Sequence, residues 1–182
     1  DVVIRNPNLR WPIPKNLPKL LRGQKILSLT RRAKYLLANC GNGTLILHLG
    51  MSGSLRILPS NTPPATHNHF DLVLENGKLM RLRDPRRFGA VLWHEGDVAT
   101  HPLLATLGPE PLEENFNAHY FYQATRGRSI SIKQCIMDNH VVVGVGNIYA
   151  NESLFRSGIK PQPAAGKLSL IRCEKLVTEI RT

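Results

Sequence analysis

Residues 141–155, VVVGVGNIYANESLF, are the stretch around which we expect this chain to be organised. Three branched apolar residues lead into Gly144-Val145-Gly146, and Asn147 then opens a segment with the spacing of an amphipathic helix. A glycine turn ahead of a helix exposes backbone N–H groups, and Asn is a favourable N-cap residue there. The helix dipole adds roughly half a positive charge at the same end. The stretch therefore predicts a binding site for an anion such as a phosphate.

The same residues are also compatible with a tight glycine turn that joins two packed elements and binds nothing. Two nucleotide-binding motifs are excluded by residue identity. Tyr149 stands where a dinucleotide fingerprint has its third glycine, and no Gly-Lys-Ser/Thr sequence follows as a P-loop requires. The origin of the phosphate must therefore be inferred from the rest of the chain.

Positive charge is concentrated in the first part of the chain. Of the 182 residues, positions 1–108 hold 15 Lys and Arg against 6 Asp and Glu, whereas positions 109–182 hold 9 against 7. Lys and Arg that neutralise phosphates release counterions and so supply sequence-independent affinity for nucleic acid. The first part is thus predicted to bind a polyanion, although solubility alone also accounts for a basic protein.

Composition argues against several classes of protein. The longest apolar runs are far shorter than the roughly 20 residues that span a membrane, and no secretory signal opens the sequence. Cys40, Cys135 and Cys173 are far apart, which argues against a disulfide framework and a cysteine-rich zinc site. We expect a cytoplasmic protein. Both ends look cut, since Asp1 begins within a strand-like run and residues 168–182 end within a helical pattern, so we expect a fragment.

Short aliphatic and β-branched runs recur between turn signals in the first part of the chain, as in an antiparallel sandwich or barrel. Residues 5–24 contain four prolines and are expected to be irregular apart from one short helical piece. Asn76-Gly77 predicts a type I′ hairpin, because both central residues of that turn need positive φ, and Asn42-Gly43 predicts a similar turn. The expected strands are residues 25–29, 35–38, 44–49, 54–58, 70–74, 78–82 and 90–93.

The sequence changes character at residues 106–111, TLGPEP, whose two prolines and glycine predict a linker. Gly158 with Pro161 gives one of the helices beyond it a C-terminal stop. We predict an α+β multidomain protein, with an antiparallel β-sandwich over residues 1–108 and a helical domain over residues 109–182. The expected helices are residues 117–125, 132–137, 148–157 and 170–181.

Two loops of the β region carry side chains that are unusual for turns. HLGMSGS (48–54) places Met51 between two glycines, and DPRRFG (84–89) places Phe88 beside two arginines. Proteins that kink duplex DNA insert apolar side chains between base steps and hold the backbone with arginine. We interpret Met51 and Phe88 as candidate wedges. The alternative for each is a side chain that folds back onto the sandwich.

Two groups of cations are further candidates. Arg31-Arg32-Ala33-Lys34 is a dense cluster in which Lys34 enters an apolar strand, where restricted hydration would suit it to act as acid, base or nucleophile. A solvated strand end is the alternative. Arg126, Arg128 and Lys133 precede the glycine turn and are candidates to flank the same phosphate.

Three histidines complete the list of candidates. His67 and His69 alternate and could bind a metal from one strand face, but no third ligand has suitable spacing, which favours surface or DNA-contacting histidines. His48 lies among leucines and, taken alone, is interpreted as a half-buried structural histidine.

Five motifs, in order and over nearly the whole chain, carry a resemblance to a known family. The chain resembles formamidopyrimidine-DNA glycosylase, of the bacterial Fpg/Nei family. The motifs are RRAKYLL (31–37), HLGMSGSLR (48–56), DPRRFGA (84–90), LGPEPL (107–112), and MDN with VVGVGNIYANESLF (137–155).

The resemblance implies a two-layered β-sandwich and a helix–two-turns–helix domain, followed in the whole protein by a zinc finger with one zinc ion. It implies a monomeric base-excision-repair enzyme, both DNA glycosylase and AP lyase. Such an enzyme excises oxidised purines such as 8-oxoguanine and formamidopyrimidines from double-stranded DNA and nicks the abasic site by β,δ-elimination. The damaged nucleotide is flipped out of the stack. No cofactor is expected within the 182 residues, and no membrane association.

The resemblance also assigns roles to individual residues. Met51, Arg86 and Phe88 match the side chains that fill the vacated space, with Arg86 facing the orphaned cytosine. Lys34 matches a lysine assigned to the elimination chemistry and to phosphate contact. The remaining DNA-contacting matches are His48, His67, Arg128, Lys133 and Asn147, to which Arg86 also belongs.

One departure from the family bears on activity. The family nucleophile is an N-terminal proline, with an adjacent Glu as acid, in a Pro-Glu-Leu-Pro-Glu segment that these residues lack. Because the amine forms the covalent intermediate, and Asp1 has neither its position nor its neighbours, the 182 residues themselves are expected to be inactive. The alternatives are an endonuclease VIII-like enzyme for oxidised pyrimidines and a non-catalytic DNA-bending module. Arg86-Arg87-Phe88 favours the purine branch.

Overall fold

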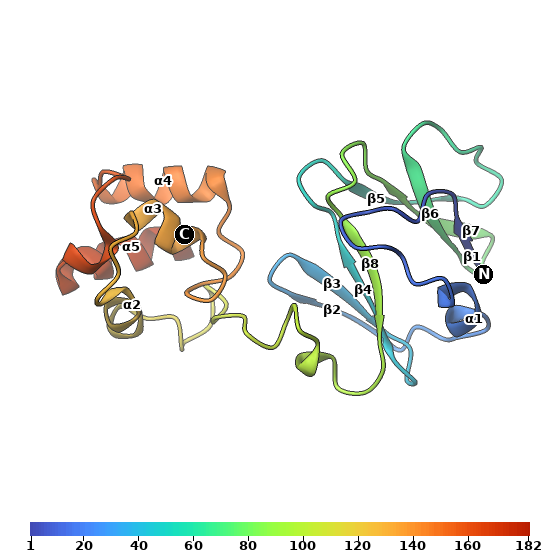
Figure 1. Cartoon of the computed structure of the whole chain (residues 1–182), viewed down its shortest axis with the longest axis horizontal. Coiled ribbons are helices and arrows are strands. Elements are labelled where there is room, and N and C mark those ends of the chain that lie inside the picture. The colour runs from blue at the N-terminus through green and yellow to red at the C-terminus, as the bar shows by residue number, and fades with distance from the viewer. The chain divides into compact units, whose positions relative to one another are not determined.

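The computed structural model describes all residues, 1–182, and divides them into two compact units (Figure 1). Asp1–His101 form the β unit and Pro102–Thr182 form the helical unit. The β unit consists of two antiparallel sheets and the helical unit of packed helices, which confirms the predicted α+β class of a β-sandwich followed by a helical domain.

The β unit contains two four-stranded sheets, with the strand orders β1-β6-β7-β5 and β2-β3-β4-β8. A short helix, α1 (Leu17–Leu21), supplies the helical piece expected among the prolines, and a 3-10 turn, η1 (Val98–Thr100), ends the unit. The strands are β1 Val2–Ile4, β2 Ser28–Arg32, β3 Tyr35–Asn39, β4 Thr44–His48, β5 Ser54–Pro59, β6 Asn68–Val73, β7 Lys78–Arg83 and β8 Ala90–His94.

The core of the β unit joins the two sheets. Phe70 and Leu82 from one sheet and Leu45 and Val91 from the other are almost completely buried in one cluster, together with Leu17 of α1. Each such side chain contributes roughly 1.5–3 kcal/mol by leaving water. The cluster holds the two sheets against each other. It therefore determines which loops lie at the same end of the β unit.

The hairpin at Asn76-Gly77 differs from the predicted type I′ turn. Only Gly77 has a positive φ, of 72°. The N–H of Leu74 donates to the carbonyl of Lys78 at 2.8 Å, so the loop has three residues and Gly77 is the left-handed one that closes it. The type I′ prediction is wrong because the strand register leaves room for a third loop residue.

The turn expected at Asn42-Gly43 is centred one residue earlier. Gly41 has φ 84°, and the N–H of Cys40 donates to the carbonyl of Gly43 at 2.8 Å. The central pair is thus Gly41-Asn42, with glycine in the first position, where a type II′ turn requires it.

The strand predicted at residues 25–29 begins three residues later, at Ser28. Arg32 pairs with Tyr35, so Ala33-Lys34 is a two-residue turn and the arginines of the cation cluster lie in β2. Lys34 therefore occupies the turn before β3 and not an apolar strand. The prediction from the apolar pattern placed the strand too early, because the Ala33-Lys34 turn and not the apolar pattern sets the register of β2.

A buried ion network holds β1, β6 and β7 together. The Asp71 carboxylate, 1% exposed, accepts hydrogen bonds from Arg81 Nε and Nη2 at 2.8 Å each and from Arg5 Nη2 at 2.6 Å. Arg81 also donates to the carbonyls of Pro63 and Thr62, which ties the β5–β6 loop to the sheet. Burial alone would raise the pKa of Asp71, but the hydrogen bonds from Arg81 and Arg5 outweigh it and lower that pKa.

The helical unit contains α2 (Ala118–Thr125), α3 (Ile132–Met137), α4 (Asn147–Ser157), the 3-10 turn η2 (Ala165–Lys167) and α5 (Leu170–Arg181). Local caps explain the helix starts: the Asn117 side chain accepts from the N–H of Tyr120, and Ser131 forms a capping box with Gln134. Helix α4 ends at Ser157 and is capped by Gly158, which has φ 66°, as predicted from the sequence.

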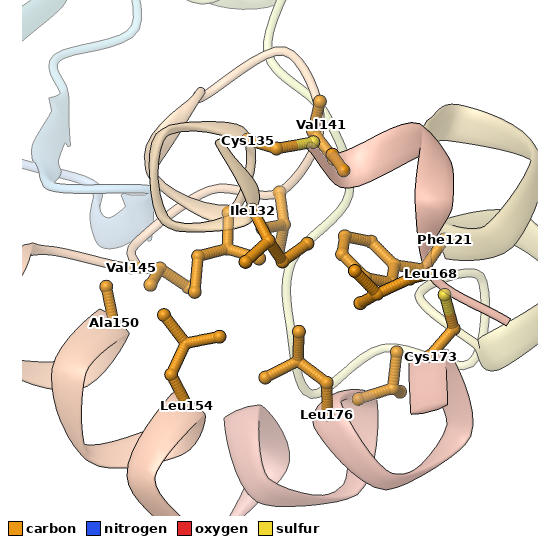
Figure 2. Packing of buried hydrophobic residues seen from close by; sticks show 14 of the residues in the cluster. Phe121, Ile132, Cys135, Val141, Val145, Ala150, Leu154, Leu168, Cys173 and Leu176 are labelled. Atoms are coloured by element: carbon orange, nitrogen blue, oxygen red, sulfur yellow. The ribbon is translucent and has the colours of Figure 1, made fainter. Parts of the chain in front are cut away.

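One hydrophobic core joins the helices (Figure 2). Phe121 of α2, Ile132 of α3, Leu154 of α4 and Leu176 of α5 point toward one another. Cys135 and Cys173 are buried in the same core, and burial raises the pKa of the Cys135 thiol to about 11, so this cysteine is an apolar packing residue.

The segment at residues 106–111, expected as a linker, is packed within the helical unit. The N–H of Gly108 donates to the carbonyl of Asn139 at 2.8 Å, and the N–H of Val143 donates to the carbonyl of Pro109 at 3.1 Å. A methyl group on Gly108 would lie 2.7 Å from the carbonyl oxygen of His140. The glycine thus permits a close backbone contact and does not mark a free connection.

Replacing Asp71 tests the ion network. We expect Asp71→Asn to destabilise the β unit by about 3 kcal/mol at pH 7, because it weakens a buried pair and leaves Arg81 under-neutralised. Since the folded pKa is lowered, the stabilisation is present above the ordinary Asp value of about 4 and is lost as the pH falls below it. Urea unfolding across this pH range should show the wild-type and variant curves converging in acid.

Glu75→Gln, at an exposed position of the β6–β7 turn, is the matched control for loss of a carboxylate. It should leave the free energy of unfolding unchanged across the same pH range. A difference between Asp71→Asn and wild type that persists undiminished in acid would contradict an ionised Asp71.

Candidate nucleic-acid interface

Two loops leave the β unit side by side. Strands β4 and β8 pair antiparallel with His48 opposite Ala90, so the loop after β4 and the loop before β8 lie at the same end of the sheet. We call residues 49–53 the Met loop and residues 84–89 the Phe loop. Met51 and Phe88 are therefore brought together by strand register.

The backbones of the two loops are in direct contact. A methyl group on Gly50, which has φ 64°, would lie 2.5 Å from the carbonyl carbon of Phe88. A methyl group on Gly89 would lie 2.6 Å from the carbonyl oxygen of His48. Real side-chain carbons do not approach so closely, so only glycine at both positions allows the loops to pack in this way.

The tips of both loops face solvent. Met51 is 73% exposed and Phe88 is 46% exposed, which excludes the alternative that both fold back onto the sandwich. Arg86 bridges the loops: its Nε donates to Ser52 Oγ at 3.3 Å, and its guanidinium carbon lies 5.6 Å from the centre of the Phe88 ring. The structure thus brings the three residues of the proposed void-filling set together on one surface.

Lys34 and His48 lie at the same end of the β unit. Tyr35, which follows Lys34, pairs with His48 across β3 and β4, and the two rings are 4.8 Å apart. Burial lowers the pKa of His48, the charges of Arg10 and Lys34 lower it further, and Asp84 opposes them. His48 is thus neutral at pH 7.

The hydrogen bond of His48 fixes its tautomer. His48 Nδ1 lies 2.9 Å from the backbone nitrogen of Gly50, whose N–H donates to it. Nδ1 must then be the unprotonated nitrogen, and Nε2 carries the proton. His48 is half-buried, as expected from the sequence, but it is more than a packing residue because it anchors the Met loop.

The two alternating histidines have different environments. His67 is exposed and has φ 69°, and its carbonyl accepts the N–H of Asp84 at 3.0 Å. His69 is buried, and its Nε2 donates to the carbonyl of Asp84 at 2.9 Å. The prediction of a surface histidine is therefore wrong for His69, because β6 is buried on both faces from Asn68 to Leu72.

Backbone strain is concentrated at this end of the β unit. Ala33, His67 and Arg87 are the non-glycine residues with positive φ. Ala33 precedes Lys34, and Arg87 lies between Arg86 and Phe88. A left-handed conformation costs these residues on the order of 1–3 kcal/mol each, and such strain collects at functional sites.

The anion site predicted in the helical unit has a different cap from the one expected. Gly146 is the N-cap of α4, and Asn147 is the first helical residue, so the interpretation of Asn147 as the N-cap is wrong. Gly144 has φ 82°. No side chain caps the helix, and the Asn147 side chain is exposed. The first N–H groups of α4 and this amide therefore remain available to an anion.

Of the three cations ahead of this helix, Arg126 serves the fold. Its guanidinium donates to the Tyr122 and Leu168 carbonyls and to Thr125 Oγ1, and its guanidinium carbon lies 3.9 Å from the centre of the Tyr122 ring. This bonding within the helical unit argues against its flanking a phosphate.

Arg128 and Lys133 are, like Arg126, partly buried. Arg128 is half-exposed and forms an ion pair with Asp138 at 3.0 Å, while its Nε donates to the carbonyl of Ala124. Asp138 in turn accepts the N–H groups of Val141 and Val142 through its backbone carbonyl, so Arg128 is tied to the start of the glycine stretch. Lys133 is half-buried in α3.

The residues present do not form a zinc site. No group of three or more His, Cys, Asp or Glu side chains is arranged to hold a metal ion, and all three cysteines are buried as free thiols. The zinc that the resemblance implies for the whole protein therefore has no counterpart among these 182 residues. None of the helices is both long enough and apolar enough to cross a lipid bilayer.

Sequence reasoning missed Asp84 and Ser52. Asp84 is completely buried at the base of the Phe loop, and Ser52 receives the Arg86 hydrogen bond. An Asp directly before Pro85, in a loop that ends in glycine, is a turn signal that could have drawn attention to Asp84. Ser52 carries no comparable signal.

The fold places this chain in a class of proteins with two parts. The first part is an antiparallel β-sandwich with paired, solvent-facing loops, and the second is a helix–two-turns–helix unit. Within that class, the chain belongs to the formamidopyrimidine-DNA glycosylase family. Residues 1–91 match the model of the formamidopyrimidine-DNA glycosylase N-terminal domain, and residues 107–182 match the model of its H2TH domain. The resemblance inferred from the five motifs is thereby confirmed.

Individual relatives agree with this assignment. Formamidopyrimidine-DNA glycosylase of Shewanella piezotolerans is 58% identical over 181 residues, which cover 100% of this chain and 66% of that protein. The crystal structure of the MutM (Fpg) protein from Thermus thermophilus is 35% identical with a TM-score of 0.86, covering 100% of this chain and 65% of that one. Lactococcus lactis Fpg in complex with DNA containing FAPY-dG is 28% identical with a TM-score of 0.91, covering 99% and 68%. The chain thus spans about two thirds of the length of its relatives.

Alanine at Gly50 tests the contact between the loops. We expect Gly50→Ala to destabilise the β unit by about 3 kcal/mol, because it adds a steric clash with Phe88 to the strain of positive φ. Gly77→Ala is the matched control: it has a similar φ, 72°, but no atom within 4 Å of the new methyl group. It should cost only about 1 kcal/mol. Equal losses in thermal unfolding would contradict a tight contact between the loops.

Proposed function

We propose that this chain is the DNA-recognising part of a base-excision-repair glycosylase that excises oxidised purines, 8-oxoguanine and formamidopyrimidines, and nicks the abasic site by β,δ-elimination. Its partner is double-stranded damaged DNA, bound by a monomer in the bacterial cytoplasm. The carrying observation is the joint exposure of Met51, Arg86 and Phe88 on two loops that touch through glycine.

The chemistry of these three residues fits an extruded nucleotide. An apolar thioether and an aromatic ring can occupy the gap that a flipped nucleotide leaves in the stack. The Arg86 guanidinium, held beside the ring, offers planar donors to an unpaired base, and we assign it to the orphaned cytosine. Met51 and Phe88 then replace the lost stacking while Arg86 replaces the lost hydrogen bonds.

The phosphate contacts are assigned to two sets of donors. In the β unit, the Lys34 ammonium lies in an exposed turn beside His48, whose Nε2–H is a neutral donor, and His67 is exposed near the Phe loop. In the helical unit, Asn147 and the first N–H groups of α4 form the anion site, with Arg128 and Lys133 as the cations. Lys34 is also our candidate for the elimination chemistry, since an amine in this position can move protons at the sugar.

The 182 residues bind DNA but do not cleave it in this proposal. The sequence contains no opening Pro-Glu segment. The nucleophilic proline amine and the adjacent acid of the family therefore have no counterpart among these residues.

Discrimination between damaged and undamaged DNA tests the proposal. A duplex that carries a tetrahydrofuran abasic analogue opposite cytosine should bind at least about tenfold more tightly than the intact duplex, since the gap is already open. Fluorescence anisotropy at moderate salt measures both dissociation constants. Equal affinities would favour the non-catalytic DNA-bending module. Preference for a gap opposite adenine or guanine would favour an endonuclease VIII-like enzyme for oxidised pyrimidines.

Borohydride trapping tests the predicted inactivity. Incubation of the 182-residue chain with an 8-oxoguanine duplex and borohydride should give no covalent adduct, because the proline amine that forms the Schiff base in this family is not among these residues. A relative that carries the opening Pro-Glu segment is the positive control. Efficient trapping by this chain would show that a nucleophile is present after all.

Asn147→Ala tests the anion site of the helical unit. The side chain is exposed and makes no capping hydrogen bond, so the variant should fold with unchanged stability. We expect about a fivefold to tenfold loss of affinity for abasic-site DNA, as for the loss of one hydrogen bond to a charged phosphate. Asn151→Ala, one turn further along the exposed face of α4, should bind as wild type. Equal effects of the two substitutions would indicate that the glycine stretch before α4 is a simple turn that binds no anion.

A further inference from the structure

Asp84 connects both ends of the Phe loop to the rest of the β unit. At the start of the loop, its N–H donates to the carbonyl of His67, and its own carbonyl accepts Arg87 N–H at 3.2 Å and His69 Nε2–H at 2.9 Å. At the end of the loop, its carboxylate Oδ2 accepts the N–H of Gly89 at 2.7 Å. One side chain thus closes a loop of six residues at its base.

The burial of Asp84 carries a free-energy cost. The residue is 0% exposed, and its second carboxylate oxygen, Oδ1, is buried without a hydrogen-bond partner. A buried oxygen that lacks a partner costs free energy, and the cost is greater for a carboxylate. Such exceptions to hydrogen-bond satisfaction call for a functional explanation.

We propose that Asp84 is a positioning residue for lesion recognition: it fixes the Phe loop so that Arg86 and Phe88 stand at the spacing from Met51 that fits the gap left by a flipped nucleotide. The inference rests on the proposed function and adds to it a residue that does not touch the DNA. Asp84 acts through the backbone of Gly89 and Phe88.

The route from Asp84 to the loop tips is short. Gly89, held by Oδ2, packs against the carbonyl of His48, and Phe88 packs against Gly50. The Met loop is anchored at its own base by the Gly50 N–H bond to His48, and Arg86 joins the two loops through Ser52. Without the Asp84 bond, the left-handed Arg87 could relax, and Phe88 would lose its fixed distance from Met51. Misplacement by about 1 Å is enough to lose most of a geometric effect.

Two substitutions at Asp84 distinguish its effect on the position of the Phe loop from the effect of its charge. Asp84→Ala removes the acceptor of the Gly89 N–H, whereas Asp84→Asn keeps an oxygen there and removes the charge. For the whole 182-residue chain, we expect Asp84→Ala to lower the preference for the tetrahydrofuran duplex over the intact duplex by about tenfold. Affinity for intact DNA should stay unchanged, and Asp84→Asn should keep most of the preference.

A second readout reports insertion directly. With 2-aminopurine next to the abasic analogue, wild type and Asp84→Asn should unstack the base and raise its fluorescence at saturating protein, and Asp84→Ala should not. Gly77→Ala, in the β6–β7 turn at the far end of β7, is the control for a modest loss of stability and should behave as wild type in both measurements.

The outcomes separate this inference from the function on which it rests. If wild type shows no preference for abasic DNA, the proposed function fails. If wild type shows the preference and folded Asp84→Ala retains it, or loses affinity equally for both duplexes, the positioning role is overturned. If Asp84→Ala does not fold, the test rests on Asp84→Asn. Normal melting of Asp84→Asn, with loss of both the preference for abasic DNA and the 2-aminopurine fluorescence increase, overturns the inference. Retention of the preference and of the fluorescence increase supports it.

Discussion

The contact between Gly50 and the backbone of Phe88 is the constraint on which the interface depends. Antiparallel pairing of β4 and β8 brings two loops to one end of the sheet, but pairing alone leaves room for side chains between them. Glycine at positions 50 and 89 removes that room. Met51 and Phe88 therefore project from backbones in van der Waals contact, at the same end of the β unit.

Local signals decided which parts of the fold could be predicted from the sequence. The bounds of α3 and α5 match the predicted ranges, and α3 starts at a capping box contained within the segment itself. The hairpin turns were predicted less well, because the φ of Asn76 depends on how many residues the β6–β7 register leaves in the loop. The same register effect moved β2 and placed Lys34 in a turn.

The candidate site shows a similar division. Met51 and Phe88 could be singled out because glycines and arginines surround them in the sequence, and their exposure agrees with that interpretation. The gathering of Lys34, His48 and the two loops could not be predicted, since it follows from the β3–β4–β8 pairing of residues far apart in the chain. The burial of His69 depends on the covering of both faces of β6, and the contacts of Asp84 are largely with backbone groups, so neither leaves much trace in residue identity.

Two buried carboxylates of the β unit differ in how their burial is compensated. Asp71 is surrounded by the guanidinium groups of Arg81 and Arg5, its oxygens are satisfied, and its charge stabilises the sheet. Asp84 has one oxygen on a glycine N–H and one with no partner, so its burial is poorly compensated. A residue chosen for stability alone would resemble Asp71, and the contrast between the two carboxylates is what the proposed positioning role of Asp84 explains.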